Sequence, residues 1–202
     1  MPASYSHPRA QALLVASRRQ IRIAAYHAER LRSQLEATPE PVMVGDHAAP
    51  RAEVQAHFEA VLLSVIAADE KLFEAIAAAH SRSTRDRRVM SLTGEWFKED
   101  WPDEHSSHES WKQSPLVMEA RRLRNQAAHR YMNKRGGPRG WEVEGMTNSE
   151  MPSQPSRDLH GFASELVIHS ETLVQIVNTI GNLPVEPEED RFLRDSLKGI
   201  VT

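Results

Sequence analysis

Apolar residues recur at intervals of three and four along most of this chain of 202 residues. Such spacing places the side chains on one face of an α-helix, because each turn holds about 3.6 residues. The pattern predicts four long helices, at about residues 8–37, 50–80, 115–133 and 158–180. No segment alternates apolar and polar residues for long enough to predict a sheet. The sequence therefore predicts an all-α fold, an antiparallel bundle of four long helices with shorter ones between them.

Prolines and glycines separate the predicted helices, because both residues disfavour the continuation of a helix. Two prolines follow the first helix and predict a loop over residues 38–49, and a longer loop is expected over 134–157. We expect one helical domain over residues 1–183 and an acidic extension with a short helix over 184–202. The segment 81–114 is expected to be irregular, with short helices. Its tryptophans are expected to pack as anchors, and the alternative is an exposed stacking platform for bases: Trp96, Trp101 and Trp111.

Two polar features accompany the apolar pattern. Asp69 lies about 40° from Val65 around the helical wheel, and we expect it at the boundary between the apolar stripe and solvent. Residues Asp103–Glu109 gather two histidines and three carboxylates. A metal site is one interpretation of this composition. Two histidines three residues apart are a weak signal for a metal, however, and a solvated polar loop is the favoured interpretation.

The composition excludes several classes of protein. The chain has no cysteine, which excludes a disulfide scaffold, thiolate zinc sites and a thiol nucleophile. Its apolar runs are far shorter than the roughly 20 residues that cross a bilayer, and the run Ala12–Ala16 is too short for the core of a signal peptide. It contains no phosphate-binding glycine loop and no serine-hydrolase motif. We expect a soluble, cytoplasmic protein without a membrane partner, a metal ion or a cofactor.

The charge is distributed unevenly along the sequence. The whole chain carries a formal net charge of −3. From Ala120 to Trp141 it contains no acidic residue and seven basic ones, so the other 18 basic and 28 acidic residues give the rest of the chain −10. A concentrated positive segment attracts phosphate groups, although a solvated arginine face on a surface helix has the same composition. The seven residues are Arg121, Arg122, Arg124, Arg130, Lys134, Arg135 and Arg139.

The third predicted helix carries a compact polar set within this basic segment: Arg124, Asn125, His129 and Tyr131. At about 100° per residue, these four side chains cover an arc of about 160°. The apolar residues of the same helix cluster on another side, so the helix can pack against a core while the polar set faces a cleft. Those apolar residues are Leu116, Ala120, Leu123 and Ala127.

These residue types suit the cleavage of RNA by its own 2′-hydroxyl group. Arginine binds phosphate through two parallel hydrogen bonds, and histidine transfers protons near neutral pH. The neighbouring Arg124 and Arg130 disfavour a charged imidazolium, which keeps His129 available as a base. A cation beside the phosphate stabilises the charge that develops on the phosphorane.

The spacing Arg-x4-His alone has little weight, because it also occurs at Arg22 and His27, a pair that we treat as a chance match. The longer pattern that starts at Arg124, Arg-Asn-x3-His-x-Tyr, is more specific. It resembles the R-x4-H-x-Y signature of HEPN domains. HEPN domains are all-α bundles that carry the signature on a late helix. Many are metal-independent endoribonucleases, which act as toxins of toxin–antitoxin systems or in antiphage defence.

The resemblance implies roles for the residues of the motif. Arg124 and His129 would be catalytic with Asn125 in support, and two copies of the motif would meet in a homodimer to form one composite cleft. In toxins paired with a nucleotidyltransferase antitoxin the motif tyrosine is a modification target, so Tyr131 would be the target here and such an antitoxin a partner. The surrounding basic residues are expected to bind the RNA: Arg121, Arg130, Lys134, Arg135 and Arg139.

Two alternatives to a ribonuclease stay open on the sequence. Some HEPN domains bind nucleotides, RNA or proteins without catalysis, and a purely structural helical adaptor would use none of the motif residues. A binding module would bind RNA with strong salt dependence and never cut it. An adaptor would lose no interaction when Arg124 and His129 are both replaced.

Overall fold

The computed structural model describes residues 7–37, 42–44, 47–49, 52–80, 87–132 and 159–183, with side chains at 7–37, 53–80, 92–125 and 159–183. This part of the chain is helical apart from one small hairpin, so the predicted all-α class is confirmed. The predicted loop over 134–157 and the C-terminal extension over 184–202 lie outside the described residues. The helices are α1 (Pro8–Ala37), α2 (Ala52–Ala79), α3 (Arg87–Asp100), α4 (Pro102–Lys112), α5 (Pro115–Met132), α6 (Leu159–His169) and α7 (Glu171–Gly181).

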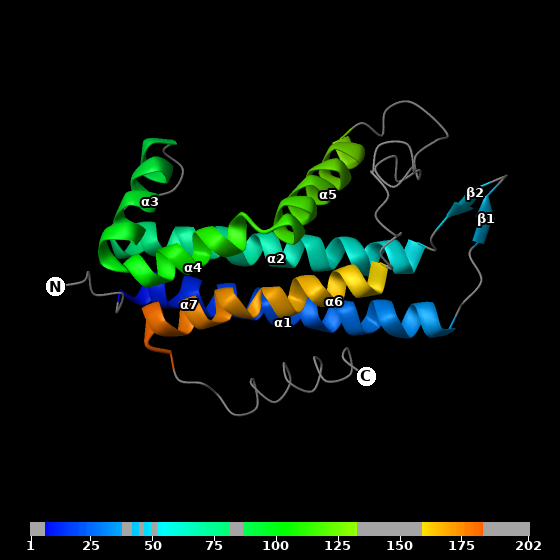
Figure 1. Ribbon diagram of the computed structural model, residues 1–202, viewed down its shortest axis with the longest axis horizontal. Coiled ribbons are helices and arrows are strands. Elements are labelled where there is room, and N and C mark those ends of the chain that lie inside the picture. Colours follow the sequence, from blue (N-terminus) through cyan, green and yellow to red (C-terminus); the bar gives the residue numbers. More distant parts are fainter. Residues whose placement is uncertain are drawn as a thin grey trace.

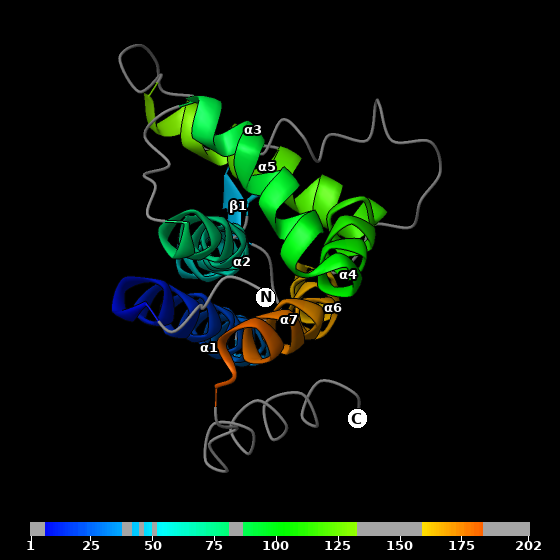
Figure 2. The ribbon, with the colours of Figure 1, turned by 90° about the vertical axis from the view of Figure 1, so that its left-hand side faces the viewer.

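The two longest helices, α1 and α2, lie side by side and run the length of the molecule (Figure 1). Both α6 and α7 pack along α1, α4 contacts α7, and α5 contacts α2. Seen along the long axis, α1, α2, α4 and the α6–α7 pair surround a common core (Figure 2). The last turns of the α5 backbone rise away from α2 (Figure 1).

The core includes an apolar seam along α1 and α2, to which the shorter helices add buried residues. Apolar periodicity predicted most of the seam. On α1 the buried residues include Leu14, Ile21, Ala24, Ala28 and Leu31, and on α2 they include Val54, Phe58, Val61, Val65, Ala68, Leu72 and Ala75. Polar contacts also cross the seam, and two of them involve specific side chains. The hydroxyl of Ser17 donates to the carbonyl oxygen of Ala68 at 2.7 Å, and the Nδ1 atoms of His27 and His57 lie 3.0 Å apart. Both contacts are lost if one helix slides by a turn, so they favour this register.

The fourth predicted helix is divided into α6 and α7 at Ser170. This serine is fully buried, and its hydroxyl donates to the carbonyl oxygen of Leu166 at 2.7 Å. A serine side chain that binds the preceding turn competes with the helical backbone, which explains the interruption. Helix α7 ends where Asn182 adopts a left-handed conformation with φ 45°, which asparagine tolerates better than most residues.

The prediction of a loop over 38–49 is wrong in part, because an antiparallel hairpin lies within these residues. Its strands are β1 (Val42–Val44) and β2 (His47–Ala49), with Val44 paired to His47. β-Branched valines at both ends of β1 favour extended backbone. Three residues are too few for an alternating pattern to be recognised in the sequence.

The predicted polar loop at Asp103–Glu109 is also wrong, because these residues lie in α4. Pro102 is the first residue of that helix, where a missing backbone N–H has no consequence. Asp103 and Glu104 occupy its first turn and interact favourably with the helix dipole. The acidic residues that suggested a solvated loop are therefore helix-starting residues.

The tryptophan-rich segment packs onto the bundle. Trp111 and Phe97 are fully buried, and Trp96 and Trp101 are half-buried against the core. Trp96 also stacks on His80, with ring centroids 4.5 Å apart. The predicted role as packing anchors is confirmed for these three tryptophans, and none of them is exposed as a stacking platform.

Candidate functional site

Helix α5 carries the described part of the predicted site, and its first turns are anchored in the bundle. Ser114 precedes the helix, and its Oγ accepts a hydrogen bond from the backbone N–H of Val117 at 3.3 Å, which caps the N-terminus. Val117 and Leu123 are buried in the core. Arg124 and Asn125 follow them, half-buried and exposed respectively. The helix thus presents these two motif residues at the surface from a fixed base.

The Arg124 guanidinium lies at the surface between two acceptors. Its Nη1 donates to Oδ1 of Asn125 at 3.3 Å, and its Nη2 lies 3.5 Å from Oε1 of Glu70 on α2. The side chains of Arg124 and Glu70 are 33% and 55% exposed. An exposed ion pair of this length contributes less than about 1 kcal/mol. An incoming anion can therefore take the place of Glu70 on the guanidinium.

The remaining predicted site residues are only partly placed. The backbone of α5 continues to Met132 and so includes three of them, whose side chains lie outside the description: His129, Arg130 and Tyr131. Three further basic residues lie outside the described chain: Lys134, Arg135 and Arg139. The structure thus brings Arg124 and Asn125 into contact, and the assignments of the others stay predictions.

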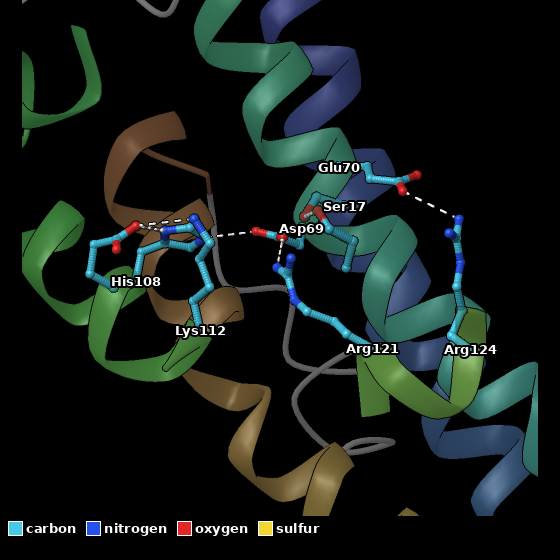
Figure 3. A network of polar contacts seen from close by, with 9 residues as sticks. Ser17, Asp69, Glu70, His108, Lys112, Arg121 and Arg124 are labelled. Atoms are coloured by element: carbon cyan, nitrogen blue, oxygen red, sulfur yellow. Dashed lines mark hydrogen bonds and ion pairs between the residues drawn. The ribbon is translucent and has the colours of Figure 1, made fainter. Parts of the chain in front are cut away.

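A buried polar network lies beside this surface (Figure 3), and the sequence did not predict it. Asp69 of α2 is only 7% exposed. Its Oδ1 accepts a hydrogen bond from Nε2 of His108 on α4 at 2.6 Å, and its Oδ2 accepts one from Nη2 of Arg121 on α5. The expected boundary position of Asp69 is therefore wrong. This carboxylate can be buried because two donors replace the water that it loses.

His108 is fully buried among aromatic rings. The centroids of Phe73, Phe97 and Trp111 lie 5.2, 5.6 and 5.9 Å from its own. Because Nε2 carries the proton that Asp69 accepts, Nδ1 is bare in the neutral ring. This Nδ1 lies 3.7 Å from Oε1 of Glu109, which is beyond hydrogen-bond distance. A ring without access to solvent is not placed to exchange protons with a substrate, so His108 positions Asp69.

Three arginines lie at the start of the segment Ala120–Trp141, which contains no acidic residue. Each of them pairs with a carboxylate that lies outside this segment. The partners of Arg121 and Arg124 lie 52 and 54 residues away in the sequence, so a charge count along the chain does not reveal them. The first pair includes the buried Asp69, whereas the second is exposed. Of the two arginines that pair with another helix, Arg124 of the motif is therefore released more easily from its partner than Arg121. The pairs are Arg121–Asp69, Arg122–Glu119 and Arg124–Glu70.

The second Arg-x4-His spacing lies on α1 and has different surroundings. His27 contacts His57 of α2 across the seam. Burial lowers the pKa of His27, and the neighbouring His57 lowers it further. This histidine therefore belongs to the contact between α1 and α2.

Asp103–Glu109 does not form the alternative metal site, since no group of three or more histidine and acidic side chains in the described residues could hold a metal ion. No described helix is long and apolar enough to cross a membrane. A scan against protein-family models finds no match to this chain, and searches of curated proteins and of solved structures find no similar protein.

Sequence reasoning did not place three residues beside the motif that define its surroundings: Asp69, Glu70 and His108. The sequence did contain a weak signal for Asp69, because it follows Val65 by four residues and an aspartate on an apolar stripe needs partners. It contained no signal for the identity of those partners. His108 and Arg121 lie on other helices, and only the packing of α4 and α5 brings them to Asp69.

Proposed function

We propose that this chain is a metal-independent endoribonuclease of the HEPN type, acting as a toxin or in antiphage defence. The proposal is carried by the contact of Arg124 with Asn125 on the outer side of a helix whose inner side is fixed in the core. The same helix continues through His129 and Tyr131. An all-α fold with the motif on a late helix agrees with what the HEPN resemblance implies.

Arg124 binds the scissile phosphate in this proposal. Glu70 is more than half exposed, so a phosphate displaces it at little cost in free energy. The guanidinium then holds two phosphate oxygens through parallel hydrogen bonds, and its charge stabilises the phosphorane. Asn125 accepts a hydrogen bond from the guanidinium and so orients it.

His129 acts as the proton carrier. It removes the proton of the 2′-hydroxyl group, whose oxygen attacks the adjacent phosphorus. The bond between phosphorus and the 5′ oxygen breaks, and that oxygen takes up a proton. The products are a 2′,3′-cyclic phosphate and a 5′-hydroxyl end. A second copy of the chain, in a homodimer with one composite cleft, supplies the second proton carrier, as the HEPN resemblance implies.

The proposed partners follow from the same surface. Asp69 binds the guanidinium of Arg121, so the main role of this arginine is to fix α5. Because Asp69 offsets its charge, Arg121 contributes less to the attraction of RNA than an unpaired arginine would. The remaining basic residues bind the RNA backbone: Arg130, Lys134, Arg135 and Arg139. Tyr131 is the proposed modification site for a nucleotidyltransferase antitoxin. The proposed location is the cytoplasm.

The proposal is tested by incubating a pool of cellular RNA with the purified chain in EDTA. We expect cleavage that leaves 2′,3′-cyclic phosphate ends, and a loss of at least about 100-fold in rate for His129→Ala. His160→Ala removes a histidine from α6 and should keep the wild-type rate. Unchanged cleavage in His129→Ala would remove the assignment. RNA binding without cleavage by the wild type, with strong salt dependence, would identify a binding module instead.

A further inference from the structure

A pair of histidines on the seam between α1 and α2 lies outside the proposed ribonuclease site. His27 and His57 are 30 residues apart in the sequence, yet their Nδ1 atoms lie 3.0 Å from each other. Their ring centroids are 5.2 Å apart, and the rings are tilted by 37°. Both side chains are only half-buried, so they stay accessible from solvent.

The short distance between the two Nδ1 atoms requires that one of them carries no proton. In such a contact one ring donates its N–H and the other offers a lone pair. The donating ring can carry its proton on Nε2 instead, with no change in its charge. Both Nδ1 atoms then carry a free lone pair, and the two atoms stay 3.0 Å apart. Two neutral imidazole nitrogens in this arrangement are ligands for a cation.

We propose that His27 and His57 form a binding site for a divalent ion of a late first-row transition metal. Metal–nitrogen bonds of about 2.0–2.1 Å place two imidazole nitrogens about 2.9 Å apart at a right angle and about 3.4 Å apart at a tetrahedral angle. The observed distance of 3.0 Å lies in this range, close to the right angle that suits Ni²⁺ and Cu²⁺. Mg²⁺ and Ca²⁺ prefer oxygen ligands and are not expected to bind.

Two protein ligands leave the other coordination positions to water. No third histidine or acidic ligand completes the site within the described residues, so we expect an exchangeable ion. Folding brings the two histidines together from distant parts of the chain. The ion therefore binds the folded state better than the unfolded one, links α1 to α2, and raises the melting temperature.

The test is a titration of the full chain with Ni²⁺, followed by calorimetry and by thermal unfolding in circular dichroism. The wild type should bind one ion at this site, and its Tm should rise by about 5 °C when free Ni²⁺ reaches about 100 times Kd. Mg²⁺ should leave the Tm unchanged. His27→Asn and His57→Gln should each lose the Ni²⁺-dependent rise, whereas His160→Ala, a matched loss of one of the ten histidines, should keep it.

A second measurement needs no variant. Ni²⁺ should protect His27 and His57 of the wild type from modification by diethyl pyrocarbonate, read by mass spectrometry, and leave His160 unprotected. The proposal is wrong if the wild type shows no Ni²⁺-dependent rise in Tm, if the two histidines stay unprotected, or if both folded variants keep the rise. None of these readouts involves RNA, so the metal site and the proposed ribonuclease activity stand or fall separately.

Discussion

The α1–α2 seam and the joint that holds α5 are stabilised by different kinds of contact. The seam is built from apolar side chains that recur at helical spacing and are buried along both helices. The joint is built around one carboxylate, Asp69, which binds His108 and Arg121 from two other helices. Apolar periodicity therefore sets the length and pairing of the bundle, whereas a polar contact between distant residues holds the helix that carries the motif.

The largest effect on stability is expected from the seam. Ile21 is 1% exposed, so Ile21→Ala leaves a cavity and should lower the free energy of unfolding by about 2–5 kcal/mol. Urea denaturation followed by circular dichroism measures this loss. Val15→Ala, at a position of the same helix that is 45% exposed, should cost less than about 0.5 kcal/mol. Equal losses in the two variants would contradict the position of the seam.

The joint is tested by two neighbouring carboxylates of α2. Asp69→Ala leaves His108 and Arg121 without their shared acceptor and should cost about 3 kcal/mol in the same urea assay. Glu70→Ala removes a carboxylate that is 55% exposed and should cost less than about 1 kcal/mol. A small loss for Asp69→Ala, equal to that for Glu70→Ala, would mean that the buried network does not hold α5.

A smaller effect is expected on RNA affinity, measured by fluorescence anisotropy with an uncleavable 2′-O-methyl RNA. Glu70→Gln removes the carboxylate that competes with phosphate for Arg124, so binding should tighten by up to about fivefold. Glu119→Gln removes the same charge from a pair with Arg122, which lies outside the motif. It should change the affinity less. If Glu119→Gln tightens binding as much, the effect is one of net charge and Arg124 is not the phosphate site.

The smallest expected effect is a pH dependence in α4, the helix that contributes His108 to the joint. Burial lowers the pKa of His105 on α4 below its usual 6.5, although Glu109 acts in the opposite sense. The unfolded chain therefore binds a proton more readily there than the folded one. This contribution to stability is complete above the usual pKa, and it decreases as the pH falls through that value towards the lower pKa of the folded state.

Urea denaturation at a series of pH values between about 7 and 5 measures this contribution, a range that spans the usual histidine pKa. His105→Gln removes the titrating group, so its stability should decrease less over that range than the stability of the wild type. Identical decreases in the two proteins would show that His105 titrates alike in the folded and unfolded states.

The sequence predicted the elements whose stabilising contacts are local or periodic. The extents of α1, α2 and α5 follow from apolar spacing and from prolines at their ends, and the structure agrees closely with them. The interruption at Ser170 was not predicted, because it depends on how one hydroxyl is used.

For the candidate site, the sequence supplied the motif on α5, and the roles of its residues stay predictions. The motif identified Arg124 and Asn125, which meet in the structure. Their carboxylate neighbour Glu70 was not predictable, because it comes from another helix and no sequence spacing links the two.

The two arginines Arg124 and Arg122 provide the most direct test of the central claim. Both lie on α5 and both face a glutamate, so replacing either with alanine removes one positive charge from the same helix. The measurement is the initial rate of RNA cleavage in EDTA by Arg124→Ala and by Arg122→Ala. A phosphate-binding Arg124 predicts a loss of at least about 100-fold for Arg124→Ala and a nearly unchanged rate for Arg122→Ala. Equal rates in the two variants would contradict the account.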